Sequence, residues 1–91
     1  MVKPYTDHPI DKGKWIRVFE PLINPNDLHW HKDETDRVIC ILNDTDWSFQ
    51  FDNEVPFKLQ RGMEFAIQKG VWHRVIKGTT KLSIMIDTFK N

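Results

Sequence analysis

Hydrophobic side chains recur at every second position along much of this chain, a period that is typical of β-strands with one buried face. The alternation is clearest from Trp47 to Asp52, where aromatic and polar side chains alternate. Other short segments of this kind are bounded by glycine, proline, asparagine or aspartate. We predict further strands at 14–20, 28–31, 36–42, 55–59, 63–67, 73–77 and 82–86. No segment has a helical period after an N-cap, so the pattern predicts an all-β sandwich or barrel.

The segment 36–42 differs from the others because it is apolar on both faces, apart from Arg37. Such a strand is expected to be covered on both sides. We place Val38 and Cys40 in the interior, on the face that also carries Asp36. Ile39 and Ile41 then point outward, where either a second layer or a partner subunit must bury them, and we favour a homodimer.

Length and proline content predict the domain organisation. Ninety-one residues make one domain. Residues 1–13 contain Pro4, Pro9 and Gly13 among polar and charged side chains, so we predict an extended N-terminal arm there. Residues 14–91 are predicted to form a single β-barrel domain.

Charge and cysteine content narrow the function classes. The 13 basic and 13 acidic residues cancel, and no basic stripe is present, which argues against nucleic acid or an anionic membrane as partner. The single cysteine, Cys40, cannot form an internal disulfide, which fits a reducing compartment. Because no apolar segment resembles a signal peptide or a membrane span, we expect a cytoplasmic protein.

Two histidines, His29 and His31, are separated by one residue, and Asp36 and His73 follow later in the chain. If residues 28–31 are extended, both imidazoles lie on one face and Trp30 on the other. Converging imidazoles and a carboxylate suit a divalent metal ion. The same histidines would also fit as packed residues at the mouth of a barrel, and Asp36 as a turn residue or a partner of Arg37.

These residues resemble the cupin family of small jelly-roll β-barrels. The first cupin motif is G-x5-H-x-H-x3–4-E-x6-G, and the second is G-x5-P-x-G-x2-H-x3-N. Together they span more than half of this chain. The matching positions are His29, His31, Asp36 and Asn43 in the first motif and Gly62, Gly70 and His73 in the second. The sequence departs from the motifs at Ile23, Asp36, Asn43, Gln68 and Lys77.

The resemblance implies a jelly-roll barrel that holds one divalent ion, either Fe, Mn, Ni, Co or Zn, through His29, His31, Asp36 and His73. Asp36 is one methylene shorter than the expected glutamate, and Glu34 in the adjacent turn is an alternative ligand. Cys40 is expected to be a small buried residue, with a ligand or redox role as the alternative.

The resemblance leaves three functions open. The first is a metal-dependent enzyme acting on a small organic substrate, either dioxygenase-like or a Lewis-acid isomerase or lyase, with its acid–base group unidentified. The second is a metal- or ligand-binding sensor or accessory module, and the third is a metal-free structural dimer. Arg17 and Arg74 are candidates to bind a substrate carboxylate, with surface ion pairing as the alternative.

Overall fold

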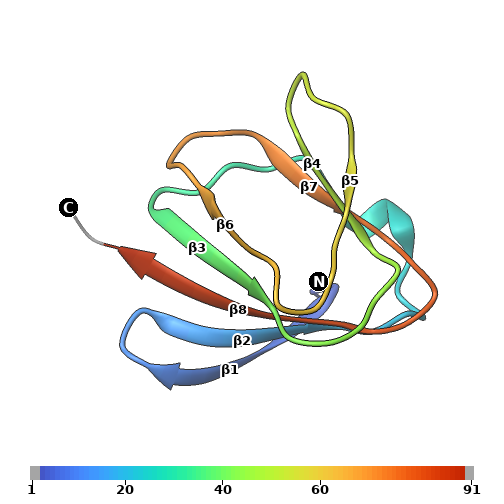
Figure 1. Cartoon of the computed structure of the whole chain (residues 1–91), viewed down its shortest axis with the longest axis horizontal. Helices are drawn as coiled ribbons and strands as arrows, with labels where there is room; N and C mark the ends of the chain where they lie inside the picture. The colour runs from blue at the N-terminus through green and yellow to red at the C-terminus, as the bar shows by residue number, and fades with distance from the viewer. Residues whose placement is uncertain (1–2, 90–91) are drawn as a thin grey trace.

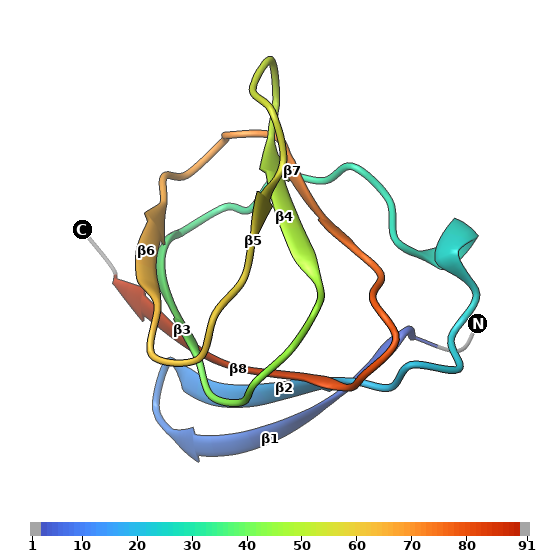
Figure 2. The same cartoon turned by 45° about the vertical axis from the view of Figure 1, so that its right-hand side comes forward.

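The computed structural model describes residues 3–89, in which eight β-strands form two antiparallel sheets (Figure 1). One sheet has five strands in the order β1-β2-β8-β3-β6, and the other has three in the order β5-β4-β7. The strands are β1 (Tyr5–Asp11), β2 (Lys14–Phe19), β3 (Asp36–Ile41), β4 (Ser48–Phe51), β5 (Phe57–Lys58), β6 (Glu64–Ile67), β7 (His73–Ile76) and β8 (Leu82–Phe89). The two sheets curve round a common centre (Figure 2), so the all-β, jelly-roll prediction is confirmed.

The hydrophobic core lies between the inner faces of the two sheets. Trp47 and Phe49 enter it from the β4 side, and alternate residues of β8 enter it from the opposite sheet. The ten buried core residues are Phe19, Ile39, Ile41, Trp47, Phe49, Leu59, Ile67, Leu82, Ile84 and Ile86. Burying such side chains contributes about 1.5–3 kcal/mol each, which makes this cluster the main source of stability.

The side chains of β3 point opposite to the predicted directions. Ile39 and Ile41 are only 4% and 1% exposed. They pair across the sheet with Ile86 and Ile84, and paired side chains share a face. Val38 and Cys40 are therefore on the outer face, where both are partly exposed. The predicted interior position of Val38 and Cys40 is wrong, and Ile39 and Ile41 give no support to a dimer.

The N-terminal segment joins the larger sheet of the same chain. β1 lies in the predicted arm and pairs antiparallel with β2 through a turn at Gly13, whose φ of 72° suits glycine. The part of the arm at residues 1–2 lies outside the described residues. β1 is an edge strand of the five-stranded sheet.

The segment between β2 and β3 is mostly irregular. It contains one 3-10 turn, η1 (Pro25–Asp27), capped by the Asn24 side chain. The strand predicted at 28–31 does not form, and only His31 makes a β-bridge. Within residues 3–89, no helix is long and apolar enough to cross a membrane.

Candidate metal centre

His31 and His73 lie directly opposite each other across an antiparallel bridge. His31 N donates to His73 O at 3.0 Å, and His73 N donates to His31 O at 2.9 Å. This reciprocal pair brings the imidazole rings to a centroid distance of 4.2 Å with an angle of 66° between their planes. Two residues that are distant in sequence therefore present their rings at one point of the cavity wall, where His73 is buried and His31 is exposed.

Each imidazole is oriented by a backbone carbonyl two residues earlier. Nδ1 of His73 lies 2.8 Å from Val71 O, and Nδ1 of His31 lies 3.1 Å from His29 O. A carbonyl oxygen can only accept, so Nδ1 of each ring carries a proton and donates it to that carbonyl. In the neutral rings Nε2 therefore has no proton and carries a lone pair. Phe49 stacks on His73 with an interplanar angle of 15° and helps to hold the ring.

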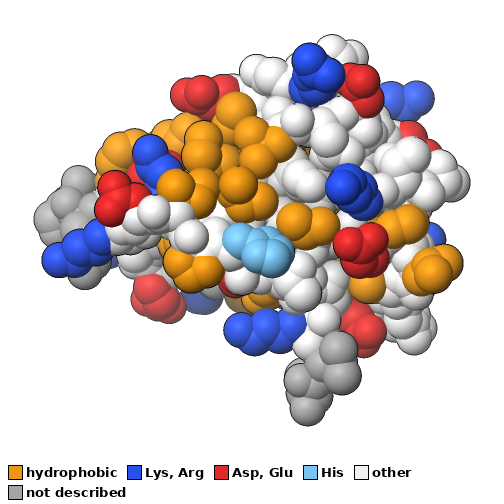
Figure 3. All heavy atoms as spheres, turned by 90° about the horizontal axis from the view of Figure 1, so that it is seen from below, with side chains coloured by type: hydrophobic (Ala, Val, Ile, Leu, Met, Phe, Trp, Pro, Cys, Tyr) orange, Lys and Arg blue, Asp and Glu red, His pale blue; other side chains and the backbone are white. Residues whose placement is uncertain are grey.

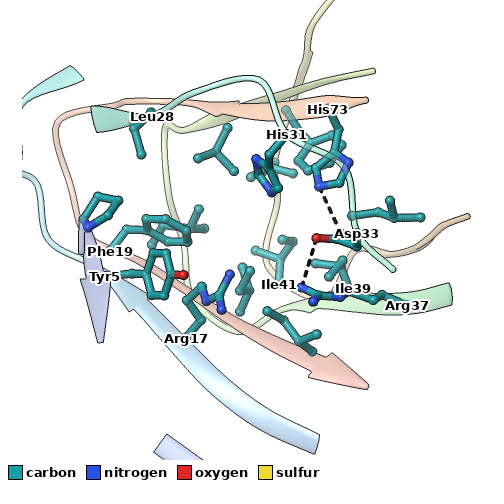
Figure 4. Close-up of a pocket in the computed structure, with 18 of the residues that line it drawn as sticks. Tyr5, Arg17, Phe19, Leu28, His31, Asp33, Arg37, Ile39, Ile41 and His73 are labelled. Atoms are coloured by element: carbon teal, nitrogen blue, oxygen red, sulfur yellow. Dashed lines mark ion pairs between the residues drawn. The ribbon is translucent and has the colours of Figure 1, made fainter. Parts of the chain in front are cut away.

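The third member of the group is Asp33, whose side chain is 8% exposed. Its Oδ2 atom lies 3.3 Å from Nε2 of His73, and Figure 4 shows the carboxylate between His73 and Arg37. The ligand atoms of His31, Asp33 and His73 all lie within 4.8 Å of one another. Two nitrogen lone pairs and a carboxylate therefore converge, which is the chemistry of a divalent cation site.

The hydrogen bonding of Asp33 tests how well the group fits a metal. Among the described residues, its buried Oδ2 accepts no hydrogen bond. The backbone oxygen of Asp33 accepts from Gly70 N at 3.0 Å, which fixes the segment beside the turn before β7. A buried carboxylate oxygen without a donor is costly unless a cation completes its surroundings. The residues therefore fit a metal ion.

The electrostatic environment favours the metal-binding protonation states of His31 and Asp33. Burial lowers the pKa of His31 below its ordinary value, and the neighbouring His73 and Arg17 lower it further. Burial alone would raise the pKa of Asp33, but His73 and Arg37 hold it below its ordinary value. The two groups are thus a neutral imidazole and a carboxylate at neutral pH.

The structure separates His29 and Asp36 from this group. The His29 side chain lines the same cavity, but it is not a member of the cluster. Asp36 begins β3 on the outer face, where its Oδ1 accepts from Lys69 N at 2.7 Å. A centre of His29, His31, Asp36 and His73 stays a prediction, while the described side chains bring together His31, Asp33 and His73.

Asp33 lies in the turn that also contains Glu34, and for that reason it was not predicted as a candidate ligand. The sequence held only a partial signal, since Asp33 follows His31 at the same spacing that separates His31 from His29. A period of two puts alternate residues on one face of an extended segment. This segment is mostly irregular, so the spacing alone does not place Asp33 beside the histidines.

A cavity of about 380 Å³ extends from the three residues into the barrel. Its walls are mostly apolar, and Arg17 and Arg37 are its two guanidinium groups. Arg74 lies elsewhere: its Nε donates to Gln50 at 2.9 Å, and its guanidinium lies 4.7 Å from the Trp30 ring. Of the two arginines singled out in the sequence, only Arg17 lines the cavity, and Arg37 was not predicted.

Comparisons with known proteins identify the fold. No protein-family model and no curated protein matches this sequence. The structure is similar to a cupin domain from Bordetella pertussis Tohama I, with 20% identity, 99% of each chain covered and a TM-score of 0.64. A cupin-2 domain protein from Shewanella frigidimarina is 21% identical over 90% of this chain and 76% of its own, with a TM-score of 0.62.

A further similar structure is the Fe(II) form of HppE, with 15% identity and a TM-score of 0.67. The match covers 84% of this chain but 41% of HppE, so this chain spans about two fifths of that protein. The sequence motifs, the two antiparallel sheets and these similar structures all indicate the same fold. The chain therefore has the fold of the cupin superfamily.

Proposed function

We propose that this protein binds one divalent metal ion through His31, His73 and Asp33 and uses it in a dioxygenase-like reaction on a small organic substrate. The observation that carries the proposal is the buried Oδ2 of Asp33, which lies beside two imidazoles whose Nδ1 atoms are already engaged. In the neutral ring of His73, the Nε2 atom that lies 3.3 Å from that oxygen has no proton to donate. A cation bound between the carboxylate and the two imidazoles would satisfy this oxygen.

The ligand set supports a reactive site. Two histidines and one carboxylate leave several coordination positions open, which is typical of non-haem iron(II) oxygenases. Bound there, the ion would supply either a binding position for dioxygen or, for Zn or Ni, Lewis-acid polarisation of a carbonyl. The Fe(II) in HppE supports testing iron first, with Mn, Ni, Co and Zn as the other candidates.

The chain's own residues would prepare this site. The carbonyls of His29 and Val71 orient the rings, and Phe49 restricts the ring of His73. Apolar walls formed by residues such as Ile41 and Phe65 exclude water from the cavity. Electrostatic interactions are stronger in such a medium, which would favour binding of a polar substrate group near the three ligands.

One observation favours a metal-free alternative. Asp33 lies 3.6 Å from Nη1 of Arg37 and 3.3 Å from Nε2 of His73. If His73 carried a second proton, the three side chains would form a buried ion-pair cluster without a metal. In that state the site would be structural, as in the metal-free dimer considered above.

Metal analysis tests the proposal. We expect about one divalent ion per chain after anaerobic reconstitution with iron(II), and none in a variant with both His31→Ala and His73→Ala. His8→Ala is the matched control, because His8 is an exposed histidine on β1. Circular dichroism verifies that each variant is folded.

Two results would contradict the proposal. The first is a wild-type protein that stays metal-free after reconstitution with iron, manganese, nickel, cobalt and zinc. The second is a doubly protonated His73 at pH 7 in ¹⁵N NMR spectra of protein exposed to these metals. Metal-dependent oxygen uptake across a panel of small acids then separates an oxygenase from a Lewis-acid enzyme or a sensor, since only the oxygenase consumes oxygen.

We also propose a cytoplasmic location, on the basis of the free Cys40 and the balanced charge of the chain. An unpaired cysteine persists most readily in a reducing compartment. Tagging the protein in its native host and measuring its distribution between cell fractions tests this location.

A further inference from the structure

The polar residues that line the cavity are the ones that could recognise a substrate. The metal-binding group and both guanidinium groups, those of Arg17 and Arg37, belong to this set. The remaining wall is apolar and includes Phe19, Ile41 and Phe49. The cavity volume of about 380 Å³ is within the range of small-molecule sites, which is roughly 300–1,000 Å³.

Arg37 is a half-buried cation whose side chain makes no hydrogen bond with the residues that the structure describes. Its side chain is 19% exposed, and its Nε atom is buried and has no partner among the described residues. Its ion pair with Asp33, at 3.6 Å, is too long for a hydrogen bond. Its other contact is with the Trp15 ring, 5.4 Å away. A guanidinium has five N–H donors, so Arg37 retains donors that a ligand oxygen can use.

Arg17 provides a contrast within the same cavity. Its Nε and Nη2 donate to the two carboxylate oxygens of Asp7 at 2.8 and 3.1 Å, and its guanidinium lies 3.7 Å from the Tyr5 ring. The charge of Arg17 is therefore neutralised by a bidentate partner. Arg37 is the arginine that is left to bind a ligand.

The charges around the cavity also favour a bound anion. With a divalent ion bound, the ion contributes two positive charges, Asp33 one negative and Arg37 one positive, which leaves two positive charges. Arg17 and Asp7 cancel, and Asp27 is an exposed residue of the cavity wall. Uncompensated charge beside apolar walls is unfavourable, and a ligand carboxylate would reduce it.

We propose that the cavity binds a small organic acid, with its carboxylate paired to the Arg37 guanidinium and its apolar body against the aromatic walls. This inference rests on the proposed function for the charge of the ion, whereas the contact with Arg37 is independent of the ion. A guanidinium binds a carboxylate through two parallel hydrogen bonds, which Lys cannot reproduce. The site should therefore distinguish acids from neutral amides of the same shape.

NMR titration of ¹⁵N-labelled protein tests the inference with two matched pairs, butanoate with butanamide and benzoate with benzamide. Each pair differs in charge and hardly in shape. We expect at least one acid to bind the zinc-loaded wild type about tenfold more tightly than its amide, equivalent to about 1.4 kcal/mol. The shifts should be concentrated at cavity residues such as Ile39 and His73.

Variants identify the arginine. Arg37→Gln should remove the preference for the acid, and Arg37→Lys should weaken it, whereas Arg17→Gln should change acid affinity less than about threefold because Arg17 is already paired. The wild-type comparison needs no variant, so misfolding of Arg37→Gln does not prevent the test. Equal binding of acid and amide, no binding of either acid, or an unchanged preference in Arg37→Gln would each overturn the inference.

Repeating the titration with metal-free protein separates the two proposals. If zinc and the other metals do not bind but the acid still binds through Arg37, the proposed metal function fails and the acid site stands. If metal binds and the acid has no advantage over the amide, the metal function stands and the acid site fails.

Discussion

At the scale of single residues, the carboxylate decides what the histidine pair can do. Asp33 and Asp36 are three residues apart, yet their side chains have different surroundings. Asp33 is beside His73 inside the barrel, and Asp36 accepts a hydrogen bond from Lys69 N on the outer side. The group of ligand atoms that lie together therefore contains His31, His73 and Asp33, and Asp36 is not a member of it.

We therefore predict that Asp33→Asn lowers the affinity for zinc by about tenfold or more, or at least about 1.4 kcal/mol, because the site loses a charged ligand. Asp36→Asn should change it less than about threefold, since its amide oxygen can still accept from Lys69 N. Competition titration against a chelator of known affinity measures both. A larger loss in Asp36→Asn than in Asp33→Asn would favour the centre predicted from the cupin motif.

The histidines and the carboxylate differ in how far the sequence could locate them. His31 and His73 were identified because their spacing to Gly70 and His29 fits two motifs. The contact between Asp33 and His73 depends on the path of an irregular segment, which hydrogen bonds such as Gly70 N to Asp33 O fix only in the folded chain. Local sequence carries little information about a contact of that kind.

At the scale of elements, β3 shows where periodicity stops being informative. Alternation gives the two faces of a strand correctly, but it cannot say which face is inside when both are apolar. The register with β8 determines which face of β3 lies in the core, because it pairs Ile39 with Ile86 and Ile41 with Ile84. The strand at Trp47 had a polar face, so its direction was predicted correctly.

The turn before β8 is held by a single carboxylate. Asp46 accepts hydrogen bonds from Thr79 N at 2.8 Å and Thr80 N at 3.2 Å, and from both threonine hydroxyls. The indole Nε1 of the fully buried Trp47 donates to Thr80 O, so the same turn is tied to the core. Asp46 therefore links the start of β4 to the start of β8.

These bonds predict a pH dependence of stability. The Thr79 hydroxyl and amide, with the Thr80 amide, hold the pKa of Asp46 well below its ordinary value of 3.8. A lowered pKa in the folded state means that the ionised form stabilises the fold above pH 3.8, and that this contribution is lost as the pH falls further. Asp46→Asn should therefore be less stable than the wild type at pH 7, with a difference that shrinks in acid.

Urea unfolding of metal-free protein between pH 7 and pH 2.5 measures this difference. Asp52→Asn serves as the control, because Asp52 is an exposed residue at the end of β4 whose side chain makes no hydrogen bond within residues 3–89. It should follow the wild type at every pH. A difference between the wild type and Asp46→Asn that stays constant with pH would show that the carboxylate charge does not stabilise the turn.

At the scale of the whole molecule, the candidate surface for a partner subunit is the outer face of the five-stranded sheet, because Ile39 and Ile41 are buried in the core. Ile16, Cys40 and Met85 lie side by side across this face, and Val38 is adjacent. All four are partly exposed. Figure 3 views the molecule from this side, and hydrophobic side chains gather on it. A contiguous apolar surface of this kind is typical of a contact between subunits.

The size of this face is compatible with a dimer. Five strands spaced about 4.8 Å apart, each about 20 Å long, cover roughly 500 Å². Two copies packed face to face would bury about 1,000 Å² in total, which is near the lower limit for a specific interface. The homodimer predicted from the sequence is thus proposed again, with a different surface as its contact.

We predict that light scattering gives twice the chain mass of 10.9 kDa at micromolar concentration. Met85→Lys should shift the mass to that of one chain, because Met85 lies between Ile16 and Cys40 on this face and a charge there is costly to bury. Leu22→Lys is the control: Leu22 is 96% exposed, lies in the segment after β2 and should leave the dimer intact. Metal affinity should be unchanged in both variants, since the metal-binding group lies within one barrel.

A monomeric wild type, or a dimer that persists in both Val38→Lys and Met85→Lys, would exclude this face as the interface.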